Sequence, residues 1–542
     1  MNGTVVDPRG SGVLTADVAV VGAGPVGMTA AALLAADGLS VVVVERNPAT
    51  SDAPKAISID DESLRVYQAA GCAERVLRVI VPGTGTKYYG ADGEPVFQAR
   101  AEVPYRFGHP FKNPFAQPDL ERELLAHLTA DPRVSVLMST ELVSLRQDAA
   151  GVELVCRTGS GPRTIRAAYA LGCDGGRSTV RDRLGIGMTG RGFDDVWLVV
   201  DVLGDPHTER FGMHHGDPRR PHVIVPGRGG RCRYEFYLHP GECAAGQQPP
   251  FELVQRLLEP FRTLTPDQVQ RAVAYRFNAL VADSWRAGRC FLLGDAAHMM
   301  PPFAGQGLNS GIRDAANLCW KIAGVLHGTL TDAALDTYET ERRPHAEATV
   351  ALSARLGRIV MTTNPRLARR RDTVVRAMMR SPDRRAYLEH MRYRPPQRYR
   401  AGLVAPGDAA PTGVMLGQPR VFDVEQGRTR LLDEVVGHGW VLLGVGVPEP
   451  GDGSALDALR PLDPVVAHVA VGDLLPASSA APRVLVDVDG GLEAETAAYR
   501  GRYVLLRPDR FVAACWPPGA PPDLGEVLAL DRAAPAGLPL AG

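Results

Sequence analysis

A glycine-rich turn near the N-terminus constrains the fold of this chain more than any other feature. The apolar run Ala16–Val21 predicts a buried strand, and Val26–Ala36 predicts a helix. Between them the chain reads V-G-A-G-P-V-G, which places Gly22, Gly24 and Gly27 in a G-x-G-x-x-G pattern. A second buried strand follows the helix. This order predicts a βαβ unit, and therefore a parallel sheet.

The residues of this turn suit a dinucleotide. Gly22 permits a tight turn, Gly24 lets the backbone approach a pyrophosphate, and Gly27 lets the helix pack against the strand. The helix N-terminus adds free N–H groups and partial positive charge. Glu45 ends the next strand, 23 residues after Gly22, where its carboxylate accepts hydrogen bonds from ribose hydroxyls and repels the 2′-phosphate of NADP. The motif therefore predicts a site for FAD or NAD.

Two further motifs separate these cofactors. Residues 172–181 (G-C-D-G-G-R-S-T-V-R) form an Asp-Gly turn before a helix start, although a simple hairpin turn would read the same way. Residues 289–298 (R-C-F-L-L-G-D-A-A-H) bring a buried strand to its carboxyl end, where open α/β sheets bind ligands. A Pro- and Gly-rich loop and a long helix from about residue 310 to 325 follow. The N-terminus of that helix suits a group that gains negative charge, such as the N1–C2=O edge of a reduced flavin.

These three motifs, in this order and spacing, resemble the FAD-dependent aromatic hydroxylases of the para-hydroxybenzoate hydroxylase type. The resemblance covers roughly residues 15–350. Within that family the chain is most similar to the 3-(3-hydroxyphenyl)propionate hydroxylase branch. The segments that carry this similarity are 117–122 (Q-P-D-L-E-R), 289–309 and 311–321 (G-I-R-D-A-A-N-L-C-W-K).

The expected architecture is α/β. The resemblance implies a discontinuous Rossmann-like FAD-binding domain at 1–185 and 286–400. Short strand-like stretches separated by Gly, Pro and Arg predict an inserted, mostly antiparallel substrate-binding sheet at 186–285. Residues 411–542 resemble the thioredoxin-like C-terminal domain of the same branch, but they lack C-x-x-C. We expect this last domain to pack or help dimerise rather than to perform redox chemistry.

The resemblance also assigns cofactor contacts. The implied FAD-binding residues are Gly22, Gly24, Pro25, Val26, Gly27, Glu45, Arg46, Lys55, Gln117, Asp174, Gly294, Asp295, Pro302, Gly305, Gly307, Leu308 and Asn309. The residues implied to line the isoalloxazine ring, and so to surround the chemistry, are Pro302, Gly307, Leu308 and Asn309. Asp295 is expected at the ribityl or pyrophosphate region, and Asp174 at the pyrophosphate and the nicotinamide entrance. His298 is expected to pack at the strand end rather than to move protons.

One position departs from the family. Relatives usually carry Arg where this chain has Lys55, which keeps the charge but loses the planar five-donor fork. The choice between NADH and NADPH therefore stays open.

The implied reaction is a monooxygenation. NAD(P)H reduces the flavin, O2 adds to give a C4a-hydroperoxide, and its distal oxygen attacks an electron-rich carbon of an aromatic substrate. A phenol is expected, because an ionised or hydrogen-bonded hydroxyl donates electrons to the ring. The base that assists it is not fixed by the sequence. Its candidates are His109, His214, His215, Tyr234 and Tyr237, each of which also has an ordinary structural explanation.

Other functions remain open on these motifs. The same cofactor chemistry serves Baeyer–Villiger oxidation or epoxidation of a polycyclic polyketide. A flavin dehydrogenase or reductase without oxygen insertion also fits, and so does a non-enzymatic flavin-binding protein. A flavin halogenase is disfavoured, because none of the five tryptophans lies in a G-W-x-W-x-I-P segment.

Composition excludes several partners. Lys and Arg number 60 against 61 Asp and Glu, so no basic excess indicates nucleic acid. No two of the eight cysteines form C-x-x-C, which disfavours a zinc ribbon or dithiol pair, and no metal is expected. No run of about 18 apolar residues occurs, and residues 1–14 lack the apolar core of a signal peptide. We therefore expect no membrane contact, a cytoplasmic location and, by general frequency, a homodimer.

Overall fold

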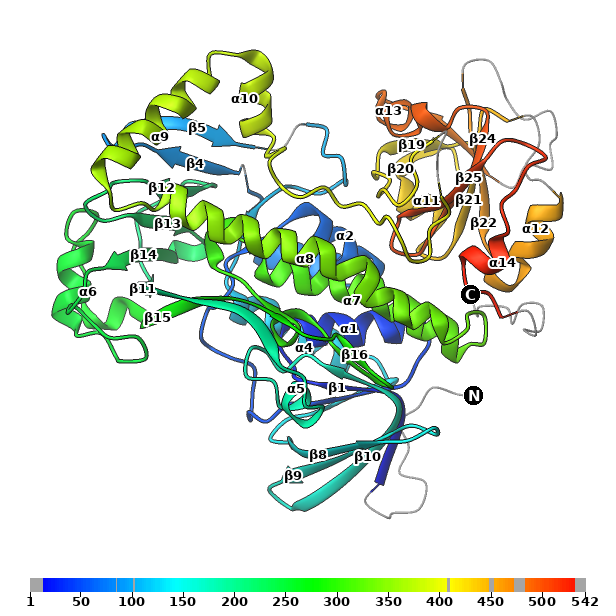
Figure 1. Ribbon diagram of the computed structural model, residues 1–542, viewed down its shortest axis with the longest axis horizontal. Helices are drawn as coiled ribbons and strands as arrows, with labels where there is room; N and C mark the ends of the chain where they lie inside the picture. Colours follow the sequence, from blue (N-terminus) through cyan, green and yellow to red (C-terminus); the bar gives the residue numbers. More distant parts are fainter. Residues whose placement is uncertain are drawn as a thin grey trace. The chain divides into compact units, whose positions relative to one another are not determined.

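The structure of the protein is a computed structural model that describes residues 13–83, 85–100, 103–406, 410–447, 453–471 and 483–531. The chain divides into two compact units. The first contains residues 1–102, 110–315 and 346–395, and the second contains 103–109, 316–345 and 396–542. Helices α7 (Gly307–Leu326) and α8 (Ala333–Val360) each run through this division (Figure 1).

The first sheet of unit 1 confirms the predicted strand–helix–strand start. Its order is β16-β17-β10-β1-β2-β7, with a hairpin of β8 and β9 attached to β10. The strands are β1 (Val13–Val21), β2 (Val41–Val44), β7 (Val134–Leu137), β8 (Glu141–Gln147), β9 (Val152–Thr158), β10 (Gly161–Gly172), β16 (Arg286–Ala287) and β17 (Cys290–Leu292). Strand β2 is four buried valines, as expected for a parallel strand covered on both faces. Because β1, β2, β10 and β17 run parallel, the motifs that follow them meet at one edge.

Helices follow these strands. They are α1 (Pro25–Ala36), α2 (Asp61–Ala69), α3 (Ala73–Val79), α4 (Gln117–Thr129) and α5 (Thr179–Arg183). Helix α1 starts with Pro25 after Gly24 as N-cap. Helix α2 is capped by Asp60, whose carboxylate accepts from the Ser63 N–H at 3.0 Å. The start of α1 agrees with the predicted helix Val26–Ala36 to within one residue.

The second sheet of unit 1 is mostly antiparallel, in the order β18-β15-β11-β14-β13-β12-β4-β5. Its strands are β4 (Thr86–Tyr89), β5 (Pro95–Ala99), β11 (Met188–Val202), β12 (Gly212–His215), β13 (His222–Pro226), β14 (Cys232–Leu238), β15 (Val269–Ala282) and β18 (His298–Met299). Three of them, β4, β5 and β18, come from outside residues 186–285. Side chains alternate between the faces. One face buries a hydrophobic cluster, including Leu198, Tyr234 and Phe236, beneath α6 (Phe251–Leu258).

Smaller elements complete unit 1. A two-stranded ribbon joins β3 (Ser58–Ile59) to β6 (Asn113–Pro114). Helices α9 (Pro365–Met378) and α10 (Pro382–Glu389) lie beside β5, as Figure 1 shows.

Unit 2 is built on a seven-stranded sheet in the order β20-β19-β23-β22-β21-β24-β25. Its strands are β19 (Arg420–Asp423), β20 (Arg428–Leu431), β21 (Val441–Val445), β22 (Val465–Val469), β23 (Val484–Asp487), β24 (Arg502–Leu506) and β25 (Val512–Trp516). Its helices are α11 (Leu432–Val436), α12 (Gly453–Leu459), α13 (Gly491–Thr496) and α14 (Leu524–Val527). One apolar cluster packs Trp440 and Trp516 with Trp320 of α7, and a second fills the other face of the sheet.

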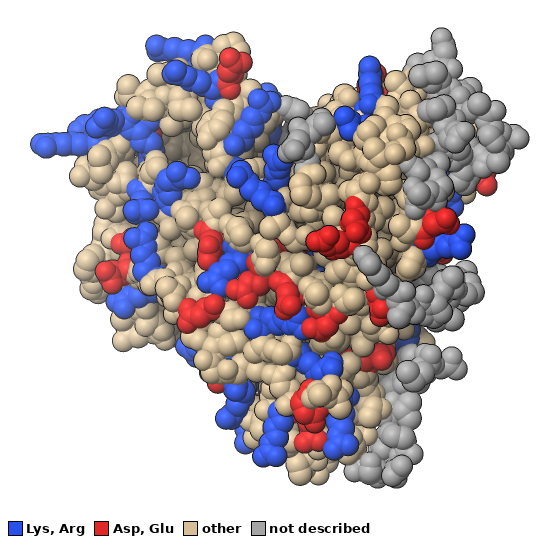
Figure 2. All heavy atoms as spheres, turned by 45° about the vertical axis from the view of Figure 1, so that its right-hand side comes forward, with Lys and Arg blue, Asp and Glu red and all other residues tan. Residues whose placement is uncertain are grey.

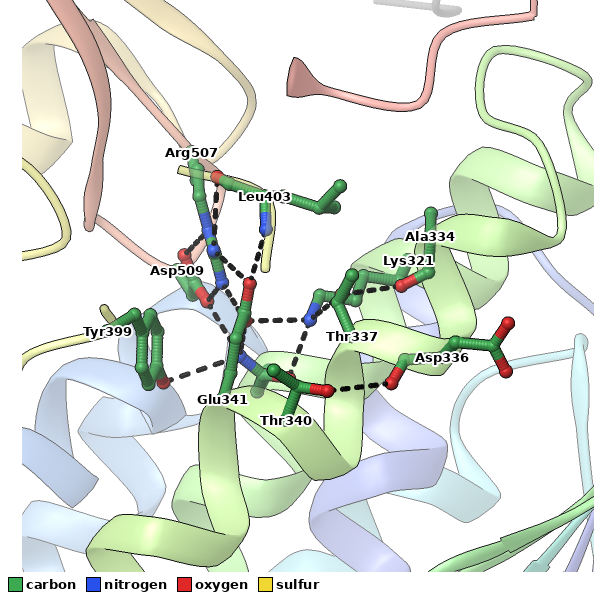
Figure 3. Close-up of polar contacts among 11 residues, drawn as sticks. Lys321, Ala334, Asp336, Thr337, Thr340, Glu341, Tyr399, Leu403, Arg507 and Asp509 are labelled. Atoms are coloured by element: carbon green, nitrogen blue, oxygen red, sulfur yellow. Dashed lines mark hydrogen bonds and ion pairs between the residues drawn. The ribbon is translucent and has the colours of Figure 1, made fainter. Parts of the chain in front are cut away.

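A buried ion network also holds unit 2 together (Figure 3). Glu341 of α8 lies between two cations: its carboxylate accepts from Lys321 Nζ at 2.7 Å and from both terminal nitrogens of Arg507 at 2.7 Å. Arg507 also donates to Asp509 at 2.6 Å. The side chains of Lys321, Glu341 and Arg507 have no exposed surface. Burial alone would raise the pKa of Glu341, but the two cations outweigh it and lower that pKa to about 2.

Surface and cysteine chemistry are ordinary. Basic and acidic side chains are interspersed across the middle of the face in Figure 2. Within the described ranges no helix is long and apolar enough to cross a membrane. Those ranges also hold no group of three or more His, Cys, Asp or Glu arranged to bind a metal ion. All eight cysteines are free thiols.

Candidate active site

The glycine turn after β1 contains one glycine, Gly24, beside which the protein leaves open space. Gly22 has φ +106°, and a Cβ there would lie 2.6 Å from the carbonyl oxygen of Cys173. A Cβ on Gly27 would lie 2.0 Å from the Gly22 oxygen. A Cβ on Gly24, in contrast, would meet no atom within 4 Å. Gly22 and Gly27 are therefore required by packing, whereas Gly24 provides room for a ligand.

Glu45 lies at the end of β2 and is held in place by the turn. Its Oε2 accepts from the Ala23 N–H at 3.0 Å, and its Oε1 accepts from the Asn47 N–H at 2.9 Å. Arg46 lines the same cavity. An oriented carboxylate therefore lies beside the helix N-terminus, where it can also accept hydrogen bonds from the hydroxyl groups of a nucleotide.

Two aspartates of the later motifs differ in how fully their carboxylates are used. Asp174, after β10, caps α5 by accepting from the backbone N–H groups of Thr179 at 2.6 Å and Val180 at 3.1 Å. Asp295, after β17, is exposed to the cavity and has no hydrogen-bond partner among the described residues. Surrounding protein desolvates Asp295 and raises its pKa. Asp295 therefore has acceptor capacity left for a ligand.

The loop before α7 is fixed from behind. Asn309 donates to the Gly305 carbonyl at 2.8 Å and accepts from the Asp60 N–H at 3.1 Å. Arg313 bridges Asp60 and Glu62, with Nε 2.7 Å from Glu62 Oε2. Pro302, Gly305, Gly307 and Leu308 line the cavity, whereas the buried Asn309 does not. The side chain of Asn309 is used inside the protein to hold the loop, rather than to face a ligand.

Gln117 organises the facing segment. Its Oε1 accepts from the Ala56 N–H at 2.8 Å, and its Nε2 donates to Glu121 at 2.6 Å. Lys55 lies on that segment and also lines the cavity.

His298 packs at the end of its motif, as expected. It is fully buried, and its Nε2 lies 2.7 Å from Asp314 Oδ2, which also accepts from the Gly294 N–H. The pair ties the strand end to α7.

The antiparallel sheet forms the opposite wall. The wall residues are His214, Val223, Val225, Arg233, Glu235, Tyr275 and Phe277. They share one face because side chains alternate along each strand and the registers align: His214 faces Val223, and Val223 faces Glu235. Phe303 closes against this wall, 5.4 Å from Phe277 and 5.3 Å from Trp197 between ring centroids. The result is an apolar, aromatic wall with polar groups at both ends.

Only one of the five candidate bases faces this cavity. His214 lines it, whereas His215 and Tyr234 point to the α6 side. The Tyr234 hydroxyl donates to Asp205 at 2.9 Å, so its structural use is clear. Tyr237 shares the wall face but packs against Trp197, and His109 is not among the lining residues.

All these groups surround one cavity of about 530 Å³. Of the 17 cofactor residues predicted from the sequence, only Gly27, Gly294 and Asn309 lie behind its surface; the other 14 line it. Sequence reasoning missed Lys112, Arg233 and Glu235, which also line it. Lys112 lies in a loop and carries no periodic signal. Arg233 and Glu235 alternate with Tyr234, but alternation alone does not tell which set faces the ligand.

The residues present fit FAD. Gly24 leaves room for a pyrophosphate at a helix N-terminus, Glu45 is oriented for a ribose, and Asp295 is an unpaired acceptor between them and the loop. The cavity then continues to the aromatic wall.

Comparison with known proteins agrees with this geometry. The sequence model of the FAD binding domain family matches residues 15–353, and that of the HcaD C-terminal domain matches residues 413–530. A 3-(3-hydroxy-phenyl)propionate/3-hydroxycinnamic acid hydroxylase of Mycolicibacterium smegmatis is 39% identical over 79% of this chain and 76% of its own length. The enzyme of the same name from Mycolicibacterium gilvum is 36% identical over 94% and 91% of the two chains.

A solved structure extends the agreement to three dimensions. Aklavinone-11 hydroxylase, in a ternary complex with FAD and aklavinone, matches with a TM-score of 0.74 and 25% identity over 95% of this chain and 99% of that chain. Family match, relatives and fold all lead to one assignment. The protein is an FAD-dependent monooxygenase that belongs to the family of FAD-dependent aromatic hydroxylases.

Proposed function

We propose that this monooxygenase hydroxylates a phenol whose side chain ends in a carboxylate, with NAD(P)H as reductant. The observation that carries the proposal is the cavity wall, in which an apolar centre for an aromatic ring is flanked by Lys112 and His214 at one end and by Glu235 and Arg233 at the other. Arg233 is already paired with Asp201, whereas Lys112 has no carboxylate partner. The relatives that are 39% and 36% identical are named for 3-(3-hydroxyphenyl)propionate and 3-hydroxycinnamic acid, two such phenols.

The cofactor contacts predicted from the sequence are part of this proposal. Gly24 and Glu45 would hold the ADP half of FAD, Asp295 the ribityl or pyrophosphate region, and the loop from Pro302 to Leu308 the isoalloxazine ring. When bound, FAD supplies hydride acceptance from NAD(P)H and transfer of one oxygen atom from O2.

The chain's own residues would orient the substrate and exclude water. Trp197, Phe277 and Phe303 pack edge to face and give the ring a dry wall. Helix α7 begins at Gly307 on the cavity surface, so its N-terminus would add partial positive charge at the part of the cavity that the loop from Pro302 to Leu308 lines. A carboxylate substrate would be held by a cation at the wall, and its ring would be fixed near the reacting position.

A substrate panel tests the proposal. We would follow NADH and NADPH oxidation in air with 3-(3-hydroxyphenyl)propionate, 3-phenylpropionate, 3-propylphenol and a tetracyclic anthraquinone phenol. The proposal expects strong stimulation and a product with one added oxygen only for the phenol that carries the carboxylate. Equal stimulation by 3-propylphenol would show that the carboxylate is not recognised.

A polycyclic substrate is the second candidate, because the match to aklavinone-11 hydroxylase covers 95% of this chain. In that case the anthraquinone would be the stimulating substrate. The structure of its product would then distinguish hydroxylation from Baeyer–Villiger oxidation or epoxidation. NADPH oxidation without any oxygenated product would indicate a reductase.

The thioredoxin-like class of the C-terminal domain, a homodimer and a cytoplasmic location are predictions. We propose that residues 411–542 form a thioredoxin-like domain with a structural role, since this segment holds one cysteine, Cys515, and no C-x-x-C. Deleting it should then destabilise the protein without changing which ring atom is oxidised.

A further inference from the structure

Lys112 brings an unpaired cation to the cavity. Its ammonium has one hydrogen-bond partner among the described residues, the neutral Thr86 Oγ1 at 3.2 Å. Its backbone is in the left-handed region with φ +52°, and a Cβ on Gly83 would come within 2.0 Å of the Lys112 carbonyl. Close packing therefore fixes the loop that presents this lysine.

The surroundings of Lys112 favour an incoming negative group. Burial, and then the charge of Arg394, lower the pKa of Lys112 to about 7, because no carboxylate is bound to it. Asp60 is the acid that opposes this effect, but its carboxylate is already paired with Arg313. A desolvated cation without a partner is unstable, and an anion that enters the cavity would supply the missing partner.

His214 lies at the same end and is suited to share such a ligand. Its ring packs against Tyr88, with the ring centroids 5.1 Å apart and the planes tilted by 30°, and its ring nitrogens have no hydrogen-bond partner among the described residues. Burial and the nearby Lys112 charge lower the pKa of His214 to about 3. The ring is therefore neutral near pH 7 and offers one donor and one acceptor nitrogen.

The far end of the wall sets the direction of binding. Val223 pairs with His214 on one neighbouring strand and with Glu235 on the other. Glu235 therefore lies two strand spacings, or roughly 10 Å, from His214. Its carboxyl group is buried, with Arg233 at 3.9 Å and the charges of Asp201 and Arg271 also acting on it. The cation at this end, Arg233, is already paired with Asp201 at 2.6 Å, and Glu235 lies beside it. An anionic substrate group would therefore bind at Lys112, which has no such pair.

We infer that Lys112, together with Thr86 and His214, forms a subsite that binds a negatively charged oxygen group of the substrate, a role that rests on the proposed function of this cavity. Both a side-chain carboxylate and an ionised phenol would present that group. Lys112 acts as the charge partner, and Thr86 and His214 complete the hydrogen bonds.

Ligand binding to the holoenzyme tests this subsite. We would titrate wild type, Lys112→Met and Lys112→Arg with 3-phenylpropionate, benzoate and 3-propylphenol, and follow the flavin absorption spectrum. A charge-assisted hydrogen bond is worth roughly 1.5–3 kcal/mol, so Lys112→Met should weaken the carboxylate ligands about 10- to 100-fold. Lys112→Arg should retain a large part of their affinity. If the phenolate is the bound group, 3-propylphenol would show the loss instead.

Lys87→Met is the matched control. Lys87 is the neighbouring lysine on β4, but its ammonium lies over the rings of Tyr89 and Phe211, and it is not a lining residue of the cavity. This variant should bind all three ligands as wild type does. FAD content and melting temperature of each variant would show that the fold is intact.

The outcomes separate this inference from the proposed function. Carboxylate binding that depends on Lys112, without hydroxylation of any phenol, would retain the subsite and overturn the function. If the enzyme hydroxylates a phenol but its Lys112→Met variant binds every ligand as wild type does, the function would be retained and the subsite overturned. A wild-type holoenzyme that binds neither carboxylates nor phenols would overturn both.

Discussion

Charged side chains have different partners in the two units of the protein. The buried network of unit 2 is paired, whereas two charged side chains that line the cavity of unit 1 have no ion-pair partner among the described residues. Glu341 is bound by Lys321 and Arg507, and none of the three side chains is exposed. Lys112 has a single neutral partner, and Asp295 has none among the described residues. The difference teaches that a fully paired network stabilises a fold by itself, whereas an unpaired charge that faces a cavity gains its stability from a ligand.

Breaking the paired network should have the largest effect. Glu341→Gln leaves two buried cations with one carboxylate, so we expect the free energy of unfolding to fall by about 3–5 kcal/mol. Chemical denaturation would measure it. Glu493→Gln is the control, because its pair with Arg500 is largely exposed (63% and 53%), and it should cost about 0.5 kcal/mol or less. A loss below about 1 kcal/mol in Glu341→Gln would contradict the comparison.

A side chain at Gly24 should weaken FAD binding without destabilising the fold. Gly24 has φ −74° and ψ 174°, which valine adopts, and its Cβ would meet only ligand. Gly24→Val should lower FAD affinity about 100-fold, or roughly 2.8 kcal/mol, with unchanged far-UV circular dichroism. Gly159→Val, whose Cβ also meets no atom within 4 Å, should keep FAD, because it lies outside the cavity. Equal FAD content in the two variants would refute this use of Gly24.

Removing the unpaired cation should stabilise the ligand-free protein, opposite in sign to Glu341→Gln. The pKa of Lys112 is lowered from 10.5 to about 7, so the unfolded chain binds more protons between these values and wild-type stability rises with pH across them. Lys112→Met lacks this rise. At pH 7 the free energy of unfolding of Lys112→Met should therefore exceed that of wild type by about 1 kcal/mol or more, and this difference should disappear toward pH 10. Denaturation at several pH values measures both trends, and a destabilised variant at pH 7 would contradict the prediction.

The smallest expected effect is the pH dependence of ligand affinity in the wild type. Because an anion needs the protonated Lys112, binding of 3-phenylpropionate should weaken a few-fold for each pH unit above 7. The charged groups around Lys112 are Arg394 and Asp60, and the adjacent His214 stays neutral in this range. In Lys112→Arg the affinity should be constant from pH 7 to 9, since arginine keeps its proton. A flat profile in wild type would exclude Lys112 as the titrating group.

The sequence predicted the motif side of the cavity better than its sheet wall. Gly22, Gly24 and Glu45 are positioned by a local strand–turn–helix pattern, so their order along the chain is enough to identify them. The wall depends on strand register, which is a non-local property. Tyr234 and Glu235 are adjacent in sequence, but only pairing with β11 and β13 decides that Glu235 faces the cavity. Asn309 shows a different limit, because its motif places it at the start of α7 but does not tell whether its side chain contacts a ligand or the protein.

Oxygen incorporation tests the central claim most directly. We would supply the holoenzyme with ¹⁸O2, NADH or NADPH, and 3-(3-hydroxyphenyl)propionate, and analyse the product by mass spectrometry. The account predicts one ¹⁸O atom per product molecule, in a new ring hydroxyl, with reductant oxidation that depends on the substrate. Reductant oxidation that proceeds equally without the phenol and leaves it unlabelled would contradict the assignment of this cavity to a phenolic acid.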